Sequence, residues 1–255
     1  MVDKLQEVAW IMGVDESTVP ILPKIKNFIN DMKGYDEKRT FFEALNLTKD
    51  KTVLDIPCGQ GGLSVYLAKN YNVSVEGYDI LPGFIENANE FATEHNVANR
   101  CHFSVEDIRN VINKGKEYDV LLWFNPPHIW ADYKQTIEHL RKCVKHNGYI
   151  LINDAYIYDE HKNVTPDYET FETLEETKES VTAHGDTIIE FVDYKDSLWA
   201  SGYQEDREAV QSAMKGVRNP DEIKEFEKLL KDIDKNEQID ARVLGIYFLV
   251  LQVAK

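Results

Sequence analysis

The sequence predicts an α/β fold in which helices cover both faces of a seven-stranded, mostly parallel sheet. Short apolar segments alternate with longer amphipathic segments from residue 51 onward. Strands that are apolar on both sides and separated by helices are typical of parallel sheets buried on both faces. The predicted strands are 52–56, 73–79, 101–105, 118–124, 148–154, 187–194 and 242–254. The last is long and apolar enough to be a central strand.

Helical patterns fill the connections between these strands. The predicted helices of the core are 61–70, 82–95, 131–145 and 168–184. In the last of them, Phe171, Leu174 and Val181 form the inward face, and His184-Gly185 is its stop.

Further helices lie outside the alternating pattern. They are predicted at 3–11, 20–32 and 36–46, before the first strand, and at 203–215 and 220–235, before the last. We therefore interpret residues 1–255 as a single domain. Its parts are an N-terminal helical cap (1–50), a core (51–196 and 241–255) and a helical insertion (197–240).

Charge and composition exclude several kinds of partner. The chain of 255 residues has a net charge of −16, with 17 basic and 21 acidic residues in 1–150 (−4) and 12 and 24 in 151–255 (−12). Such a field repels nucleic acid and anionic membranes, so neither is expected as a partner. The N-terminus lacks the apolar core of a signal peptide, and no apolar run could span a membrane. Cys58, Cys101 and Cys143 lack metal-ligand spacing, which predicts reduced thiols, no metal centre and a cytoplasmic protein.

Residues 53–62, VLDIPCGQGG, are an apolar strand that runs into a glycine-rich turn. Such a turn, where it opens a helix, lets a ligand approach backbone N–H groups. A phosphate-binding loop is disfavoured because the turn has no lysine. A dinucleotide fingerprint is disfavoured because Ser64 stands where a third glycine should follow Gly59 and Gly61. The acid Asp55 and a helix N-terminus together suit a zwitterion.

The residues Asp55 to Gly61 resemble the first motif of class I S-adenosylmethionine (SAM)-dependent methyltransferases, an acid and an apolar residue followed by G-x-G-x-G. Pro57 replaces the first glycine; it fits a turn with negative φ in which only the carbonyl is used. The resemblance covers roughly residues 50–155. It implies a Rossmann-like sheet, SAM as cofactor, and helical additions that cover the substrate side.

The resemblance also implies that polar groups at successive strand ends hold the cofactor. Asp79 would accept the ribose hydroxyls, and Asp107 would lie near the adenine amino group. In isolation, either acid could equally be a helix N-cap. The predicted cofactor-binding residues are Asp55, Pro57, Gly59, Gly61, Asp79, Ile80, Asp107, Ile108, Phe124 and Asn125.

The segment Asn125-Pro126-Pro127-His128 resembles the Asn-Pro-Pro-aromatic motif of amino-directed methyltransferases, with histidine in place of the aromatic residue. Its simpler interpretation is that the prolines break the strand and His128 caps the next helix. If the acceptor carries a proton at neutral pH, a base is needed. His128 is the first candidate for this catalytic role and Asp154, at the end of the fifth strand, is the second.

The leading hypothesis is a SAM-dependent methyltransferase whose partner is a small-molecule methyl acceptor. One alternative is an amino-methyltransferase that acts on protein or nucleic acid through Asn125-Pro126-Pro127-His128. Another is a regulatory protein that binds SAM without catalysis. A nicotinamide-dependent enzyme is disfavoured by Ser64.

Overall fold

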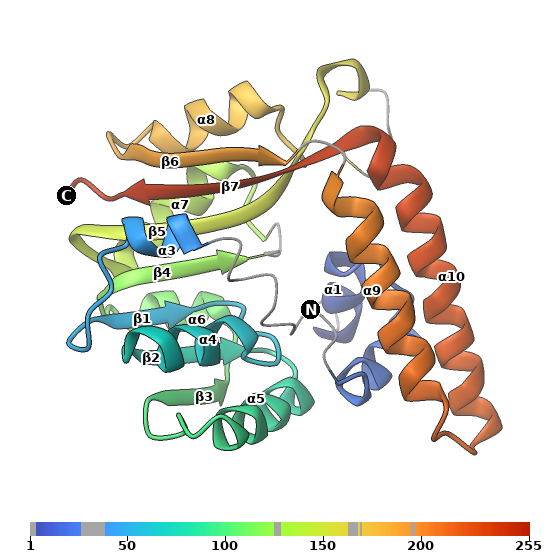
Figure 1. Ribbon diagram of the computed structural model, residues 1–255. Helices are drawn as coiled ribbons and strands as arrows, with labels where there is room; N and C mark the ends of the chain where they lie inside the picture. Colours follow the sequence, from blue (N-terminus) through green and yellow to red (C-terminus); the bar gives the residue numbers. More distant parts are fainter. Residues whose placement is uncertain (1–3, 27–38, 125–128, 163–167, 169, 195–196) are drawn as a thin grey trace.

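The computed structural model describes residues 4–26, 39–124, 129–162, 168, 170–194 and 197–255. Its centre is a seven-stranded sheet in the order β3-β2-β1-β4-β5-β7-β6 (Figure 1). The strands are β1 (Thr52–Asp55), β2 (Ser74–Asp79), β3 (Cys101–Val105), β4 (Tyr118–Phe124), β5 (Val144–Ile157), β6 (Thr187–Tyr194) and β7 (Leu244–Gln252). The predicted seven-stranded fold is confirmed.

The strand directions follow from the connections. β1 pairs in parallel with β2 and β4, with Val53 opposite both Val75 and Val120. A helix crosses over between each of these strands, as parallel neighbours require. β7 runs antiparallel to β5 and β6 and lies between them, so the prediction of an interior last strand is correct.

Two helical layers bury the faces of the sheet. On one face lie α3 (Arg39–Ala44), α4 (Gly62–Tyr71) and α5 (Pro82–Glu94), packed on side chains such as Val53 and Val75. On the other lie α6 (Ile108–Asn113), α7 (Tyr133–Leu140) and α8 (Leu174–Thr182), packed on Leu121 and Ile152. Burial on both faces explains why the strands are almost wholly apolar.

A third group of helices stands beyond the carboxyl ends of the strands. It contains α1 (Lys4–Ile11), the 3₁₀ helix η1 (Glu16–Lys24), α9 (Ser197–Met214) and α10 (Pro220–Val243). In Figure 1, α9 and α10 run side by side opposite the strand ends, with α1 next to them. Val19, Leu22, Val210 and Phe226 are buried together with Phe84 of α5, so the two ends of the chain share one small core.

Several predicted elements differ from the structure. The helix predicted at 20–32 is the 3₁₀ helix η1 up to Lys24, because Pro20 and Pro23 cannot donate the hydrogen bonds of an α-helix. Part of the segment predicted as helix 131–145 is strand, since Val144 already pairs with Tyr118. The helix α3 packs on the sheet instead of joining the helices beyond the strand ends.

Some helix boundaries also differ from the predicted ones, in one case because of a local capping interaction. The helix predicted at 168–184 begins only at Leu174, after a capping box in which Thr173 and Glu176 exchange side-chain and backbone hydrogen bonds. It ends at Thr182, and Gly185 follows with φ of +85°. Helix α10 extends to Val243, beyond the end of the helix predicted at 220–235.

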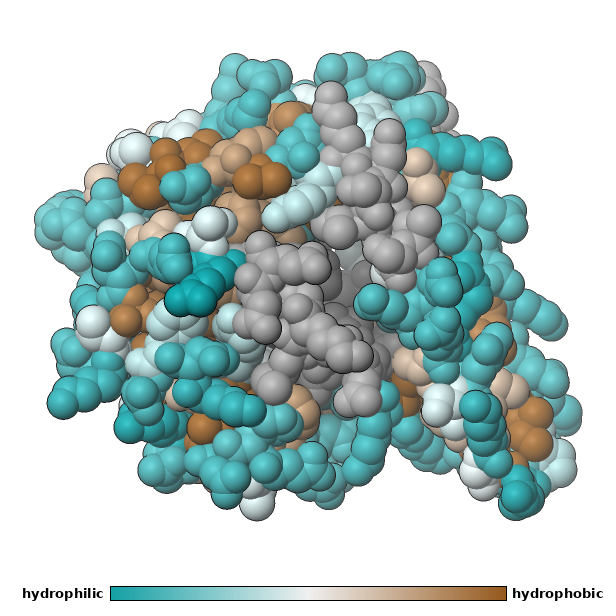
Figure 2. Space-filling view, in the orientation of Figure 1, coloured by the Kyte–Doolittle hydropathy of each residue, from teal (hydrophilic) through white to brown (hydrophobic). Residues whose placement is uncertain are grey.

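The face seen in Figure 2 is mainly hydrophilic, with apolar side chains scattered among polar ones. This agrees with the large excess of acidic residues. Among the described residues, no helix combines the length and the apolar character needed to cross a membrane.

Candidate functional site

The sheet has one point where its strand order reverses, between β1 and β4. Connections that leave these two strands go to opposite faces, α4 to one and α7 to the other. Open α/β sheets bind ligands in the crevice that this reversal creates at the carboxyl ends of the strands. Asp55 ends β1, Phe124 ends β4, and Asp79 ends the neighbouring β2. The structure thus brings these predicted residues to one edge.

The glycine-rich turn after β1 is fastened to the end of β2. The backbone N–H of Gly59 donates to Oδ2 of Asp79 at 2.9 Å, and the N–H of Leu81 donates to Oδ1 at 3.0 Å. The N–H of Cys58 donates to the carbonyl of Tyr78 at 2.9 Å. The N-cap of α5 is Leu81, so the alternative of Asp79 as a helix cap is wrong. Asp79 instead orients the turn.

The two matched glycines serve different purposes. Gly59 and Gly61 both have positive φ, of 50° and 81°, where residues with a Cβ are disfavoured. A Cβ on Gly61 would lie 2.9 Å from Ala88 and from Phe103, so Gly61 allows α5 and β3 to pack closely. Among the residues that the structure describes, a Cβ on Gly59 would meet nothing within 4 Å. Gly59 therefore borders open space, where a ligand can approach the backbone.

The turn also contains Pro57, whose peptide bond with Ile56 is cis. Its predicted role in cofactor binding stays a prediction.

Two buried carboxyl groups lie at this edge. Asp55 is 3% exposed and accepts the Ser64 hydroxyl at 2.6 Å, and Asp79 is 6% exposed. Burial raises the pKa of Asp55 to about 7 and that of Asp79 to about 6. Among the described residues, no lysine or arginine forms an ion pair with either group. The edge therefore offers acceptors to a ligand's hydroxyl or ammonium groups.

Asp107 does cap a helix, as its alternative interpretation held. Its carboxylate accepts the Arg109 N–H at 2.9 Å at the start of α6, and it pairs with the Arg109 guanidinium at 2.7 Å. That guanidinium lowers the pKa of Asp107. A contact of Asp107 with adenine stays a prediction.

The remaining cofactor candidates lie in apolar surroundings. Ile108 is buried against the α6–α7 face, and Ile80 is half-buried against the core shared by α1, η1, α9 and α10. Phe124 is half-buried and meets Phe248 edge-on, with ring centroids 5.3 Å apart. These three side chains can line a site but supply no polar group. Asn125 lies outside the described residues.

One of the two proposed bases, Asp154, lies among the residues that the structure describes. His128, with the rest of the Asn125-Pro126-Pro127 segment, lies outside the described residues. Asp154 is 7% exposed and accepts the Tyr133 hydroxyl at 2.5 Å and the Ala155 N–H at 2.7 Å.

A pair of amides that the sequence did not single out joins the turn to the N-terminal segment. Gln60 Nε2 donates to the carbonyl of Ile25 at 3.0 Å. Asn87 Nδ2 donates to Oε1 of Gln60 at 3.1 Å and to the carbonyl of Pro23 at 2.7 Å. Their partners are up to 64 residues away along the chain, so no local pattern signals them.

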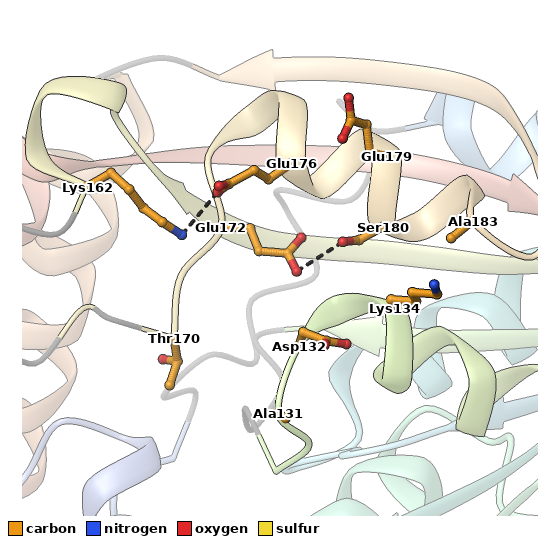
Figure 3. A pocket seen from close by; sticks show the side chains of 10 residues that line it. All are labelled: Ala131, Asp132, Lys134, Lys162, Thr170, Glu172, Glu176, Glu179, Ser180 and Ala183. Carbon is orange, nitrogen blue, oxygen red and sulfur yellow. Dashed lines mark hydrogen bonds and ion pairs between the residues drawn. The ribbon is translucent and has the colours of Figure 1, made fainter.

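A separate pocket of about 510 Å³ lies between α7 and α8 (Figure 3). Asp132, Lys134, Glu172 and Ser180 are among its lining residues. Within the described residues, no group of three histidine, cysteine, aspartate or glutamate side chains could hold a metal ion.

Comparison with known proteins assigns the class. The profile of a family described as "Methyltransferase domain" matches residues 47–232, which is most of the chain. The chain therefore belongs to this methyltransferase domain family.

Two curated relatives are phosphoethanolamine N-methyltransferases. The chain is 29% identical over 123 residues to one from Triticum aestivum, covering 48% of this chain and 24% of that protein. It is 27% identical over 214 residues to phosphoethanolamine N-methyltransferase 1 of Arabidopsis thaliana, covering 81% and 40%. The chain thus spans less than half the length of these relatives.

Solved structures share the fold. A SAM-dependent methyltransferase from Thiobacillus denitrificans, in complex with S-adenosyl-L-homocysteine, superposes with a TM-score of 0.76 at 18% identity, covering 93% of this chain and 98% of that one.

Proposed function

We propose that this methyltransferase domain binds SAM in the crevice between β1 and β4 and transfers its methyl group to a small molecule. The observation that carries the proposal is the hydrogen bond from Gly59 to Asp79, at the reversal point of a methyltransferase fold. It joins the predicted first motif to the predicted ribose acceptor.

The residues present fit this cofactor. Each oxygen of Asp79 accepts a backbone N–H, from Gly59 or from Leu81, and a carboxylate has about four lone-pair sites for further hydrogen bonds such as those from two ribose hydroxyls. No described residue lies within 4 Å of a Cβ placed on Gly59, which leaves the backbone of the turn accessible on that side. Asp55 and Asp79 add buried acceptors that favour a ligand carrying an ammonium or sulfonium charge. Phe124 and Ile80 can contact the apolar faces of such a ligand.

When bound, SAM supplies an electrophilic methyl group and a neutral leaving group. The protein has to align the acceptor with that methyl group and exclude water, which is worth up to roughly 7–11 kcal/mol. The helices α1, η1, α9 and α10 stand where they could close over the crevice. If the acceptor must lose a proton, His128 remains the first candidate for the base.

Three features support a small-molecule acceptor in the cytoplasm. The curated relatives include phosphoethanolamine N-methyltransferases. The net charge of −16 disfavours nucleic acid. The three cysteines are free and buried, as in a reducing compartment.

Calorimetry with S-adenosylhomocysteine tests the cofactor. Asp79→Ala should weaken binding by roughly 1.5–3 kcal/mol, the range for hydrogen bonds to a charged group. An unchanged affinity in a folded Asp79→Ala protein would remove Asp79 from the site.

Turnover of SAM tests the acceptor class. A panel of phosphoethanolamine, simple amines and phenols should include a substrate, whereas DNA, RNA and peptides should not. Methylation of a macromolecule alone would favour the amino-methyltransferase alternative. Tight S-adenosylhomocysteine binding without turnover on any acceptor would favour a regulatory protein.

A further inference from the structure

Tyr133, the first residue of α7, is held at two points by carboxylates from other elements. Its backbone N–H donates to Oε1 of Glu172 at 3.1 Å, and its hydroxyl donates to Oδ2 of Asp154, on β5, at 2.5 Å. Tyr133 and Asp154 are each 7% exposed. Burial and the nearby Asp154 charge hold the pKa of Tyr133 well above its ordinary value. The phenol is therefore the hydrogen-bond donor.

Both carboxylates are themselves held in place. The second oxygen of Asp154 accepts the Ala155 N–H at 2.7 Å. Glu172 lies just before α8 and also accepts the Ser180 hydroxyl at 3.0 Å (Figure 3). Burial raises the pKa of Glu172. Tyr133, Asp154 and Glu172 thus join α7, β5 and the start of α8; we call these three residues the Tyr133 clamp.

The clamp stands at the end of the connection that leaves β4. Residues 129–132 are the part of this connection that the structure describes, and β4 itself flanks the reversal point. Trp130, three residues before Tyr133, stacks on His139 of α7, with ring centroids 4.7 Å apart and planes 14° apart. It also packs against Trp123 of β4, at 5.9 Å. The aromatic packing of Trp130 and the clamp together fix residues 130–133, which lead into α7.

A general base must come within about 2.6–3.2 Å of the proton it removes. The carboxylate of Asp154 is buried and directed at the Tyr133 hydroxyl on the α7 face of the sheet. We infer that Asp154 is a positioning residue, not the base: through Tyr133 it sets residues 129–133 at the start of α7, and with them the approach of the acceptor. This inference rests on the proposed function.

The decisive variant is Tyr133→Phe, which removes the hydroxyl that donates to Asp154 and also interacts with the Tyr247 hydroxyl. Its matched control is Tyr118→Phe, because Tyr118 is 3% exposed and donates to the Glu76 carboxylate at 2.7 Å, but at the opposite end of β4. Hydrogen exchange of residues 129–136 should quicken in Tyr133→Phe only. With the best acceptor of the panel, kcat/KM should fall about tenfold, the effect of losing one hydrogen bond of about 1.4 kcal/mol. Binding of S-adenosylhomocysteine should change less than about twofold.

Variants of Asp154 separate positioning from proton transfer. Asp154→Asn keeps an oxygen that can accept the Tyr133 hydroxyl, so it should retain more activity than Asp154→Ala. Asp154→Ala should match Tyr133→Phe, and the double variant should be no worse than either single one. The dependence of the rate on pH should be unchanged in Asp154→Asn.

Distinct results would overturn the inference. A loss of about 10²–10⁴-fold in Asp154→Asn, together with an active Tyr133→Phe enzyme, would identify Asp154 as the base. Equal hydrogen exchange and equal turnover in Tyr133→Phe and Tyr118→Phe would refute the role of the clamp and leave the proposed function standing. A wild-type protein that turns over no acceptor would refute the proposed function, and with it any catalytic role for the clamp.

Discussion

The guanidinium of Arg109, on α6, donates to both carboxylate oxygens of Glu7, on α1, at 2.9 and 3.0 Å. The same guanidinium pairs with Asp107 at the carboxyl edge of the sheet. Residues 102 positions apart thereby fasten the N-terminal helix next to a predicted adenine contact. Several expected outcomes depend on such contacts between distant segments.

We expect Arg109→Ala to release α1. Arg109 is partly exposed, so the loss of stability should be only about 1 kcal/mol, near the upper limit for surface ion pairs. Hydrogen exchange of α1 should nevertheless quicken, and S-adenosylhomocysteine should slow it less than in the wild type. The control is Arg39→Ala, which removes an exposed pair with Glu43 within α3. Equal exchange of α1 in both variants would contradict the role of Arg109.

We expect Asn87→Ala to loosen the N-terminal segment from the glycine-rich turn. It leaves the Gln60 amide oxygen and the Pro23 carbonyl without this donor, at a cost of about 1–3 kcal/mol. Asn89→Ala is the control, because the Asn89 side chain donates to the carbonyl of Ile85 within its own helix. Thermal unfolding would measure both, and a larger loss in Asn89→Ala would show that this amide link contributes little.

We expect alanine to affect stability and cofactor binding differently at the two glycines of the turn. Gly61→Ala should destabilise the protein strongly, because its Cβ would clash with Ala88 and Phe103. Gly59→Ala should cost about 1–2 kcal/mol from the positive φ alone, since its Cβ meets open space. It should nevertheless weaken S-adenosylhomocysteine binding. Thermal unfolding and calorimetry separate the two, and full binding by Gly59→Ala would place the cofactor elsewhere.

We expect Asp55 to make stability depend on pH. Its pKa of about 7 lies above the ordinary value of 3.8, so the folded state binds the proton more tightly than the unfolded state. This contribution to stability is complete below about pH 4 and disappears as the pH rises through about 7. Asp55→Asn should therefore gain stability relative to the wild type between pH 5 and pH 8, by a few kcal/mol at most.

Asp119→Asn is the control for that experiment. Lys145, Lys51 and Thr52 hold the pKa of Asp119 well below its ordinary value, so it stays ionised from pH 5 to pH 8. The change that Asp119→Asn causes in the free energy of unfolding, measured in urea, should be the same at pH 5 and at pH 8. A difference between Asp55→Asn and wild type that does not change with pH would refute the raised pKa of Asp55.

We expect His128→Ala to lower kcat by about 10²–10⁴-fold if His128 is the base. The wild-type rate should then fall as the pH drops through the histidine pKa, and this acid limb should vanish in the variant. S-adenosylhomocysteine affinity should hardly change. A rise in KM with the acid limb retained would instead assign His128 to substrate orientation.

The sequence alone determined the class of fold and the location of the turn that opens the site. Apolar residues recur every two residues in a strand and every three to four in a helix. These spacings lie along the chain, so they can be recognised without knowing the tertiary structure. The motif from Asp55 to Gly61 is equally local, and both the sheet and the family agree with it. One local prediction was wrong: the segment that contains Pro20 and Pro23 forms a 3₁₀ helix where an α-helix was predicted.

Tertiary structure decided what each polar residue does. Asp79 and Asp107 look alike in the sequence, yet Asp107 caps a helix and Asp79 holds the N–H of Gly59. The difference arises because the crossover through α4 places β2 in parallel beside β1, and residues 20 positions apart meet where the two strands end. Asp154 is likewise joined to Tyr133 only because α7 packs on β5. A hydrogen bond requires that donor and acceptor lie close in space, whereas the sequence gives only their separation along the chain.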